Sequence, residues 1–163
     1  AAAGAMVLLI RRAQALMEAA GDDGDFDALC QQLHRYQATL RTCFTLENFD
    51  NLIKNGRMRP IVGTLLRSLG IHIIADATAE GTIHVADKAR GVGKTYRAIT
   101  ALMKASKDCT DAEVVISHCE NLEGAMALKR QILADLPVKQ VDLLSCRGLT
   151  SFYAMEKGLI VGY

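Results

Sequence analysis

Residues 82–106 read TIHVADKARGVGKTYRAITALMKAS, and within them one hydrophobic period gives way to another. Apolar and polar side chains alternate over residues 82–86, which is typical of a strand. Over residues 92–106 the apolar side chains recur every three or four positions, which predicts an amphipathic helix. A strand that leads directly into a helix favours an α/β fold.

The junction between these two elements nearly matches a nucleotide-binding P-loop. That motif reads G-x-x-x-x-G-K-[ST], because its glycines let backbone N–H groups curl around a phosphate. Gly93, Lys94 and Thr95 supply its second half. Lys88, however, stands where the first glycine is required. A nucleotide-binding enzyme that uses residues 91–95 is therefore the third and least favoured hypothesis.

Outward from this stretch, helices precede a hairpin, and strands alternate with helices after it. Helical spacing is expected over residues 6–20, 26–36, 46–53, 61–69 and 122–136, with Gly21, Asp25, Thr45 and Pro60 at helix boundaries. Strands are expected over residues 42–44, 71–75, 82–86, 114–116, 138–144 and 159–161. The order predicts one α/β domain, residues 1–163, with a mixed β-sheet flanked by helices. Strands joined by a helical crossover should be parallel neighbours, and the hairpin antiparallel.

The composition excludes several classes of protein. A formal net charge of +1 gives no reason to expect nucleic acid as a partner. Apolar runs are too short to span a membrane. The five cysteines are widely spaced and contain no C-x-x-C pair, which argues against a disulfide framework or a metal site and fits the cytoplasm.

No constellation of residues predicts catalysis, a metal ion or a cofactor. His72 and His84 could face each other across the hairpin, but cross-strand neighbours of this kind are more often surface pairs. His118 and Cys119 are adjacent near a strand end, so their side chains should point to opposite faces and form no dyad. The sequence therefore predicts a protein that is not an enzyme.

Apolar residues crowd one short region that contains a predicted helix and strand. They are expected to be core, or to line a deep slot for an apolar ligand. The expected slot residues are Ile61, Leu65, Leu66, Leu69, Ile71 and Ile73.

Several short motifs, in this order, resemble the DegV family of bacterial fatty-acid-binding proteins. Residues 54–58, KNGRM, resemble the family's K-G-G-R-I turn, and residues 88–91, KARG, match its K-x-R-G. Residues 65–73 resemble a leucine-rich helix that runs into a strand, and residues 158–161 resemble the closing strand. The likeness identifies the chain as the C-terminal, acyl-tail domain of such a protein.

The resemblance implies a carrier that presents a long-chain fatty acid to a fatty acid kinase. It implies that an N-terminal domain, absent from this chain, holds part of the carboxylate site. Arg90 would meet the kinase, and Arg57 and Ala154 would lie at the carboxylate-side rim. Many members have H-x-G-P-G near the end, and Ala154 occupies the histidine position here. Alanine offers no side-chain hydrogen bond to a carboxylate.

Two further expectations follow. An isolated fragment of a two-domain protein would expose an apolar face, through which it could dimerise. The second hypothesis is an interaction or regulatory domain that binds no ligand, with the slot collapsed into ordinary core.

Overall fold

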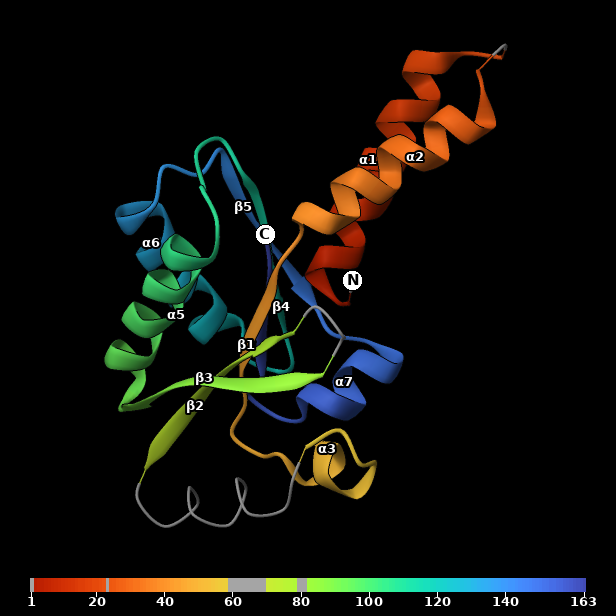
Figure 1. Cartoon of the computed structure of the whole chain (residues 1–163). Helices are drawn as coiled ribbons and strands as arrows, with labels where there is room; N and C mark the ends of the chain where they lie inside the picture. The colour runs from red at the N-terminus through yellow and green to blue at the C-terminus, as the bar shows by residue number, and fades with distance from the viewer. Residues whose placement is uncertain (1, 23, 59–69, 79–81) are drawn as a thin grey trace.

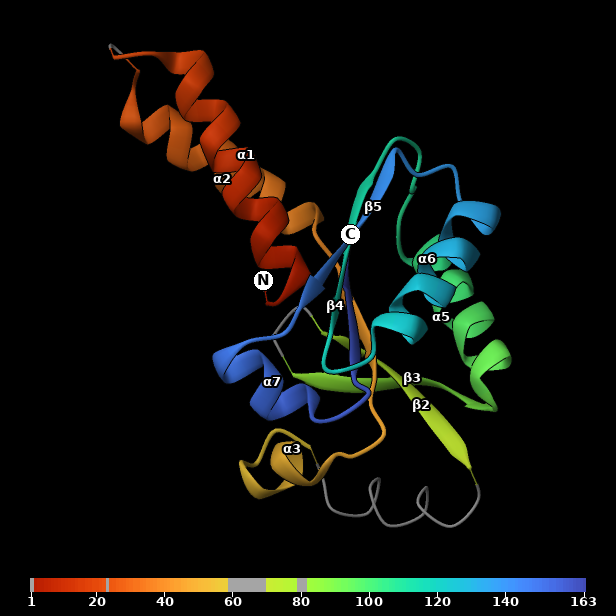
Figure 2. The same ribbon diagram turned by 180° about the vertical axis from the view of Figure 1, so that it is seen from behind.

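The computed structural model describes residues 2–22, 24–58, 70–78 and 82–163, which form one sheet with helices on both faces (Figures 1 and 2). The helices are α1 (Gly4–Ala20), α2 (Phe26–Thr39), α3 (Asp50–Lys54), α5 (Val92–Ser106), α6 (Leu122–Asp135) and α7 (Gly148–Ala154). The strands are β1 (Thr42–Thr45), β2 (Ile71–Ala77), β3 (Ile83–Arg90), β4 (Glu113–His118), β5 (Gln140–Ser145) and β6 (Leu159–Gly162).

The sheet is mixed, as the sequence predicts. Its strand order is β3-β2-β1-β6-β4-β5. Strands β4 and β5, which α6 joins, are parallel neighbours, and every other neighbouring pair is antiparallel. The expectation for the α5 crossover is wrong, because β2, β1 and β6 lie between β3 and β4.

Helices α5 and α6 cover one face of the sheet, which we call the first face. Beneath them, Ile99 and Met103 of α5 and Leu128 and Ile132 of α6 are completely buried. These residues recur every three or four positions, so each helix turns one apolar stripe toward the strands. Among the described residues, this layer contains most of the buried apolar side chains.

The opposite, second face carries α1, α3 and α7 (Figure 2). Its buried cluster, which we call the second-face cluster, centres on Ile73 and Ala75 of β2 and Ala154 of α7. The other buried members are Leu46, Phe49, Leu52 and Met58. Residues near both ends of α3 therefore contribute to this smaller core.

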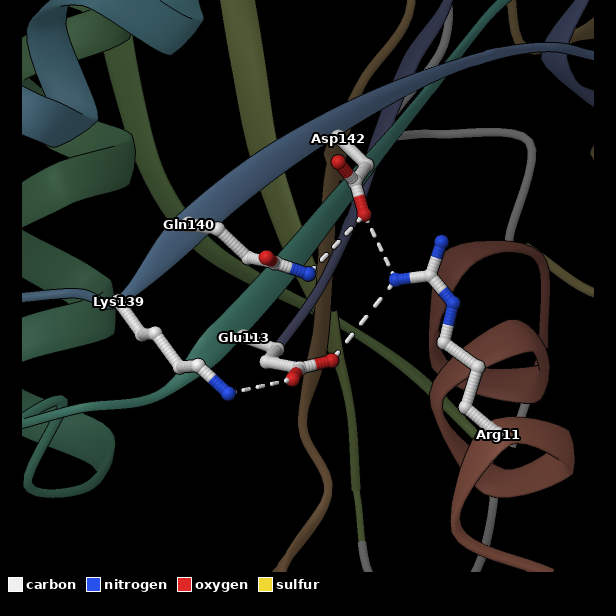
Figure 3. Close-up of polar contacts among 5 residues, drawn as sticks. All are labelled: Arg11, Glu113, Lys139, Gln140 and Asp142. Atoms are coloured by element: carbon white, nitrogen blue, oxygen red, sulfur yellow. Dashed lines mark hydrogen bonds and ion pairs between the residues drawn. The ribbon is translucent and has the colours of Figure 1, made fainter. Parts of the chain in front are cut away.

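Helix α1 meets the sheet through its first two turns. The backbone of Ala5 lies very close to Gly162. A Cβ atom added at position 162 would overlap the backbone of Ala5. Farther along, Arg11 Nη1 donates a 2.6 Å hydrogen bond to Asp142 Oδ2 and lies 3.8 Å from Glu113 Oε2 (Figure 3). Beyond Arg11, α1 and α2 project from the body as a hairpin (Figure 1).

Helix α2 begins where the sequence predicts, because the Asp25 carboxylate accepts hydrogen bonds from the backbone N–H groups of Asp27 and Ala28. None of its residues is fully buried. Phe26, expected on its apolar stripe, is 74% exposed. Helix α1 covers only one side of α2, so the stripe is no more than half-buried.

Other predicted boundaries differ from the observed ones. Thr45 is the last residue of β1 and does not cap a helix. Helix α3 begins later, at Asp50, whose backbone N–H donates to Asn48 Oδ1. The helix expected over residues 61–69 lies outside the described residues. Helix α7 is not predicted from the sequence.

Candidate functional site

The candidate site lies at the edge of the sheet where β1, β3, β4 and β5 end. Thr45 of β1 and His118 of β4 both pair with Leu159, the first residue of β6. Arg90 at the end of β3 pairs with Ile71 at the start of β2. These pairings bring strand ends and the loops after them to one edge, the usual ligand-binding edge of open α/β sheets.

Two loops at this edge enclose a shallow pocket of about 240 Å³. One loop follows β1 and supplies Glu47 and Asn48. The other precedes β6 and supplies Met155, Glu156 and Lys157. Four of these five residues have polar side chains, but polar and apolar atoms contribute about equally to the pocket surface.

The loop before β6 is held in an unusual backbone conformation. Met155 has φ 54° and Lys157 has φ 64°, in the left-handed region that disfavours side chains. The Lys157 N–H donates to the Cys119 carbonyl, and Asn121 Nδ2 donates to the Lys157 carbonyl. A proline at position 157 would be locked near φ −65°. The loop therefore departs from an H-x-G-P-G conformation, besides lacking the histidine.

The second-face cluster forms the apolar side of this edge. Ile73 and Ala154 are 0% exposed, and half-buried Ile71 packs against the same cluster. The structure thus brings together three of the residues selected from the sequence. Ile61, Leu65, Leu66 and Leu69 lie outside the described residues.

The two selected arginines are both exposed but belong to different parts of the edge. Arg90 ends β3 next to Ile71. Arg57 follows α3, and its N–H donates to the Leu52 carbonyl. Asn51 of α3 donates from Nδ2 to the Phe152 carbonyl of α7 at 2.7 Å. This bond joins the helix before Arg57 to the helix that contains Ala154.

Two polar side chains at this edge were not selected from the sequence as binding residues. Thr45 Oγ1 and His118 Nδ1 are buried on the first face and have no hydrogen-bond partner within the described residues. They flank Leu159, one from each neighbouring strand. Buried polar atoms normally pair with protein or ordered water, so these two are available to such groups. Thr45 and His118 come together only because their strands pair with β6, and no local sequence pattern predicts that pairing.

Burial sets the ionisation of several groups near the edge. Desolvation raises the pKa of Tyr96, and the carboxylates of Glu47 and Glu123 raise it further. Desolvation also raises the pKa of Cys119, and it raises the pKa of Cys146 to about 11. These groups are therefore neutral at pH 7 and offer no ready nucleophile.

The structure argues against the P-loop interpretation. Lys88 and Arg90 belong to β3, and only Gly91 separates that strand from α5. The Thr95 hydroxyl, in the first turn of α5, donates to the Gly91 carbonyl just before the helix. No loop is left between strand and helix to wrap a phosphate.

His72 and His84 do not face each other across the hairpin. His84 pairs with Asp76, with 3.0 Å between Nδ1 and Oδ1, while His72 pairs with Ala89 and lies 3.7 Å from Glu47. Across the described residues, no group of three or more His, Cys, Asp or Glu side chains is placed to hold a metal ion. None of the described helices is long and apolar enough to cross a membrane.

A mixed sheet with helices on both faces, whose strand ends meet an apolar cluster, defines a domain of the α/β class. The chain belongs to the DegV family, whose family model matches residues 2–159. A DegV domain-containing protein of Streptococcus pneumoniae is 32% identical over 164 residues, covering 99% of this chain and 56% of that protein. One of Streptococcus gordonii is 32% identical over 139 residues, covering 85% of this chain and 49% of that protein.

Solved structures show the same fold. The Streptococcus pneumoniae Fatty Acid Kinase (Fak) B3 protein, loaded with linoleic acid, matches with a TM-score of 0.89 and 30% identity, over 100% of this chain and 57% of that one. A DegV family protein from Eubacterium eligens, loaded with heptadecanoic acid, matches with a TM-score of 0.88 and 25% identity, over 96% and 55%. The chain thus spans about half the length of these relatives.

Proposed function

We propose that this chain is the acyl-tail domain of a carrier that binds a long-chain fatty acid and presents it to a fatty acid kinase. The observation that carries the proposal is the likeness to the linoleic acid-loaded Fak B3 protein over the whole chain. Half-buried Ile71, which packs against the second-face cluster at this edge of the sheet, supports it. Each CH₂ of a buried tail contributes about 0.8 kcal/mol, so an apolar slot alone supplies substantial affinity.

In this proposal the protein performs no chemistry. The carboxylate is held partly by a second, N-terminal domain outside this chain and partly by the rim that contains Arg57 and Ala154. Ile71 and Ile73 are the described residues that the proposal assigns to the slot. The other residues selected for it, within 61–69, lie outside the described residues. The carrier and its kinase meet in the cytoplasm.

The experiment is native mass spectrometry of the complete gene product, followed by organic extraction of the bound material. A stoichiometric fatty acid supports the carrier. An unliganded mass that incubation with oleic acid leaves unchanged rejects it.

Docking to the kinase is tested separately through Arg90, which is exposed at the end of β3. We expect Arg90→Ala to lower the rate of fatty acid phosphorylation while leaving fatty acid binding unchanged. Arg130→Ala is the matched control, because Arg130 is an exposed arginine on α6. Equal rates for the two variants would remove Arg90 from the docking surface.

A domain without ligand is the second candidate. The complete burial of Ile73, Ala75 and Ala154 favours it, because side chains of the protein already pack around them. The oligomeric state is a separate question. A dimer formed by the isolated chain, and not by the complete gene product, would be a consequence of truncation. Sedimentation of both proteins shows whether either one dimerises.

A further inference from the structure

Cys119 and Cys146 are neighbours at the ends of the two parallel strands. The parallel pairing of β4 and β5 runs through His118 and Ser145, and the next pair in register is Cys119 with Cys146. The Cys146 N–H donates to the His118 carbonyl at 2.7 Å, so the ladder continues into this pair. Neighbouring strands lie roughly 4.8 Å apart, a Cα separation within the range that a disulfide spans.

The two side chains lie on the same face of the sheet. Cys119 follows Val115 at even spacing along β4, and Val115 faces Gly4 of α1 on the second face. Cys146 follows Asp142 at even spacing, and Asp142 binds Arg11 of the same helix. Both thiols are half-buried, and both pack against the second-face cluster.

We propose that Cys119 and Cys146 form a reversible disulfide that staples the ends of β4 and β5 when the protein meets a small-molecule disulfide. One protein thiolate attacks a sulfur of the reagent, forms a mixed disulfide and expels one reagent thiolate. The second protein thiolate attacks the protein-bound sulfur and expels the other reagent thiolate. Two protein thiols are oxidised, and one reagent disulfide is reduced to two thiols.

The staple would act on α7. Cys146 lies two residues before α7, and Ala154 at the end of that helix is buried in the same cluster. A covalent link at Cys146 restrains the start of α7 against β4. The link forms between the chain's own thiols and does not depend on fatty acid binding.

The reaction is slow at neutral pH and faster in alkali. Desolvation raises the pKa of both thiols, that of Cys146 to about 11, so only a small fraction is thiolate at pH 7. Because the thiolate is the nucleophile, the rate of cross-linking should rise with pH between pH 7 and 9.

The test is peptide mapping of the complete gene product after incubation with hydroxyethyl disulfide and alkylation of the remaining thiols. Digestion with trypsin and a glutamate-specific protease separates Cys109 from Cys119, because cleavage after Glu113 and Glu120 leaves residues 114–120. We expect this peptide linked to residues 140–147, and released by dithiothreitol.

Two serine variants complete the test. Cys146→Ser should abolish the linked peptide, and the matched control Cys30→Ser, at a half-buried thiol on α2, should leave its yield unchanged. Full alkylation of Cys119 and Cys146 after oxidation of the wild-type protein would overturn the proposal. So would separate mixed disulfides on the two thiols without any link between them.

Discussion

Arg11 of α1 donates a 2.6 Å hydrogen bond to Asp142 of β5, a residue 131 positions further along the chain. Glu113 of β4 lies 3.8 Å from the same guanidinium and 3.3 Å from Lys139 (Figure 3). The projecting hairpin is thus tied to the two parallel strands by one arginine and two carboxylates.

Arg11→Ala should lower the free energy of unfolding by about 0.5–1 kcal/mol, because the ion pair is partly exposed and screened by solvent. The loss should shrink in 1 M salt, where charges are screened over about 3 Å. Urea unfolding at two ionic strengths measures both effects. Arg35→Ala, an exposed arginine on α2, is the control. An equal loss in that variant would show that the contact with Asp142 contributes nothing specific.

Gly162→Ala should destabilise the fold by about 1–3 kcal/mol or more, because overpacking forces backbone shifts. The new Cβ would overlap backbone atoms of Gly4 and Ala5, which no side-chain rotation relieves. Gly93→Ala is the matched control. Position 93 has open space and lies in α5, so alanine there should stabilise by up to about 1 kcal/mol. Chemical denaturation of both variants is the measurement. If Gly162→Ala is as stable as wild type, α1 does not pack on β6 as described.

Local patterns predicted the longest helices and missed α7. The bounds of α5 follow from the sequence because a glycine precedes an uninterrupted amphipathic stripe. Helix α7 has seven residues, and Leu149 and Phe152 on it are exposed, so it presents no apolar period. The strand order depends on pairing between residues 42–45 and 159–162, which no local pattern encodes.

The candidate site was predictable only in part, for the same reason. Ile71 and Ile73 stand out in the sequence because apolar residues are dense around them. Thr45 and His118 carry no such signal, because their proximity arises only when both strands pair with β6. Ala154 was selected through a family motif, and its burial in the second-face cluster follows from α7.

Ile73→Ala should lower the free energy of unfolding by about 2–5 kcal/mol, because truncating a buried isoleucine leaves a cavity. Ile10→Ala is the matched control, since Ile10 is 60% exposed and its truncation should change stability by less than about 0.5 kcal/mol. Thermal and urea unfolding of the unliganded protein measure the difference. Similar stability for both variants would mean that Ile73 lines open space rather than packed core.

Asp135 is held in its charged form by two side chains. Thr100 Oγ1 donates to its carboxylate at 2.7 Å and Gln131 Nε2 at 2.8 Å, and these bonds lower the pKa of Asp135 below its ordinary value. A carboxyl group whose pKa is lower in the folded state stabilises the fold above its unfolded pKa, about 3.9. That contribution is lost as the pH falls through the lower, folded pKa.

Thr100→Val should therefore raise the pKa of Asp135 toward its ordinary value, with a smaller rise in Gln131→Ala, because Thr100 is the larger cause of the shift. Carboxyl chemical shifts followed by NMR from pH 2 to 6 give the pKa directly. Asp108 is an internal control: its pKa is lowered by hydrogen bonds from Thr110, which neither substitution touches. A pKa of Asp135 that stays low in Thr100→Val while Asp108 is unchanged would show that the threonine hydroxyl does not bind this carboxylate in solution.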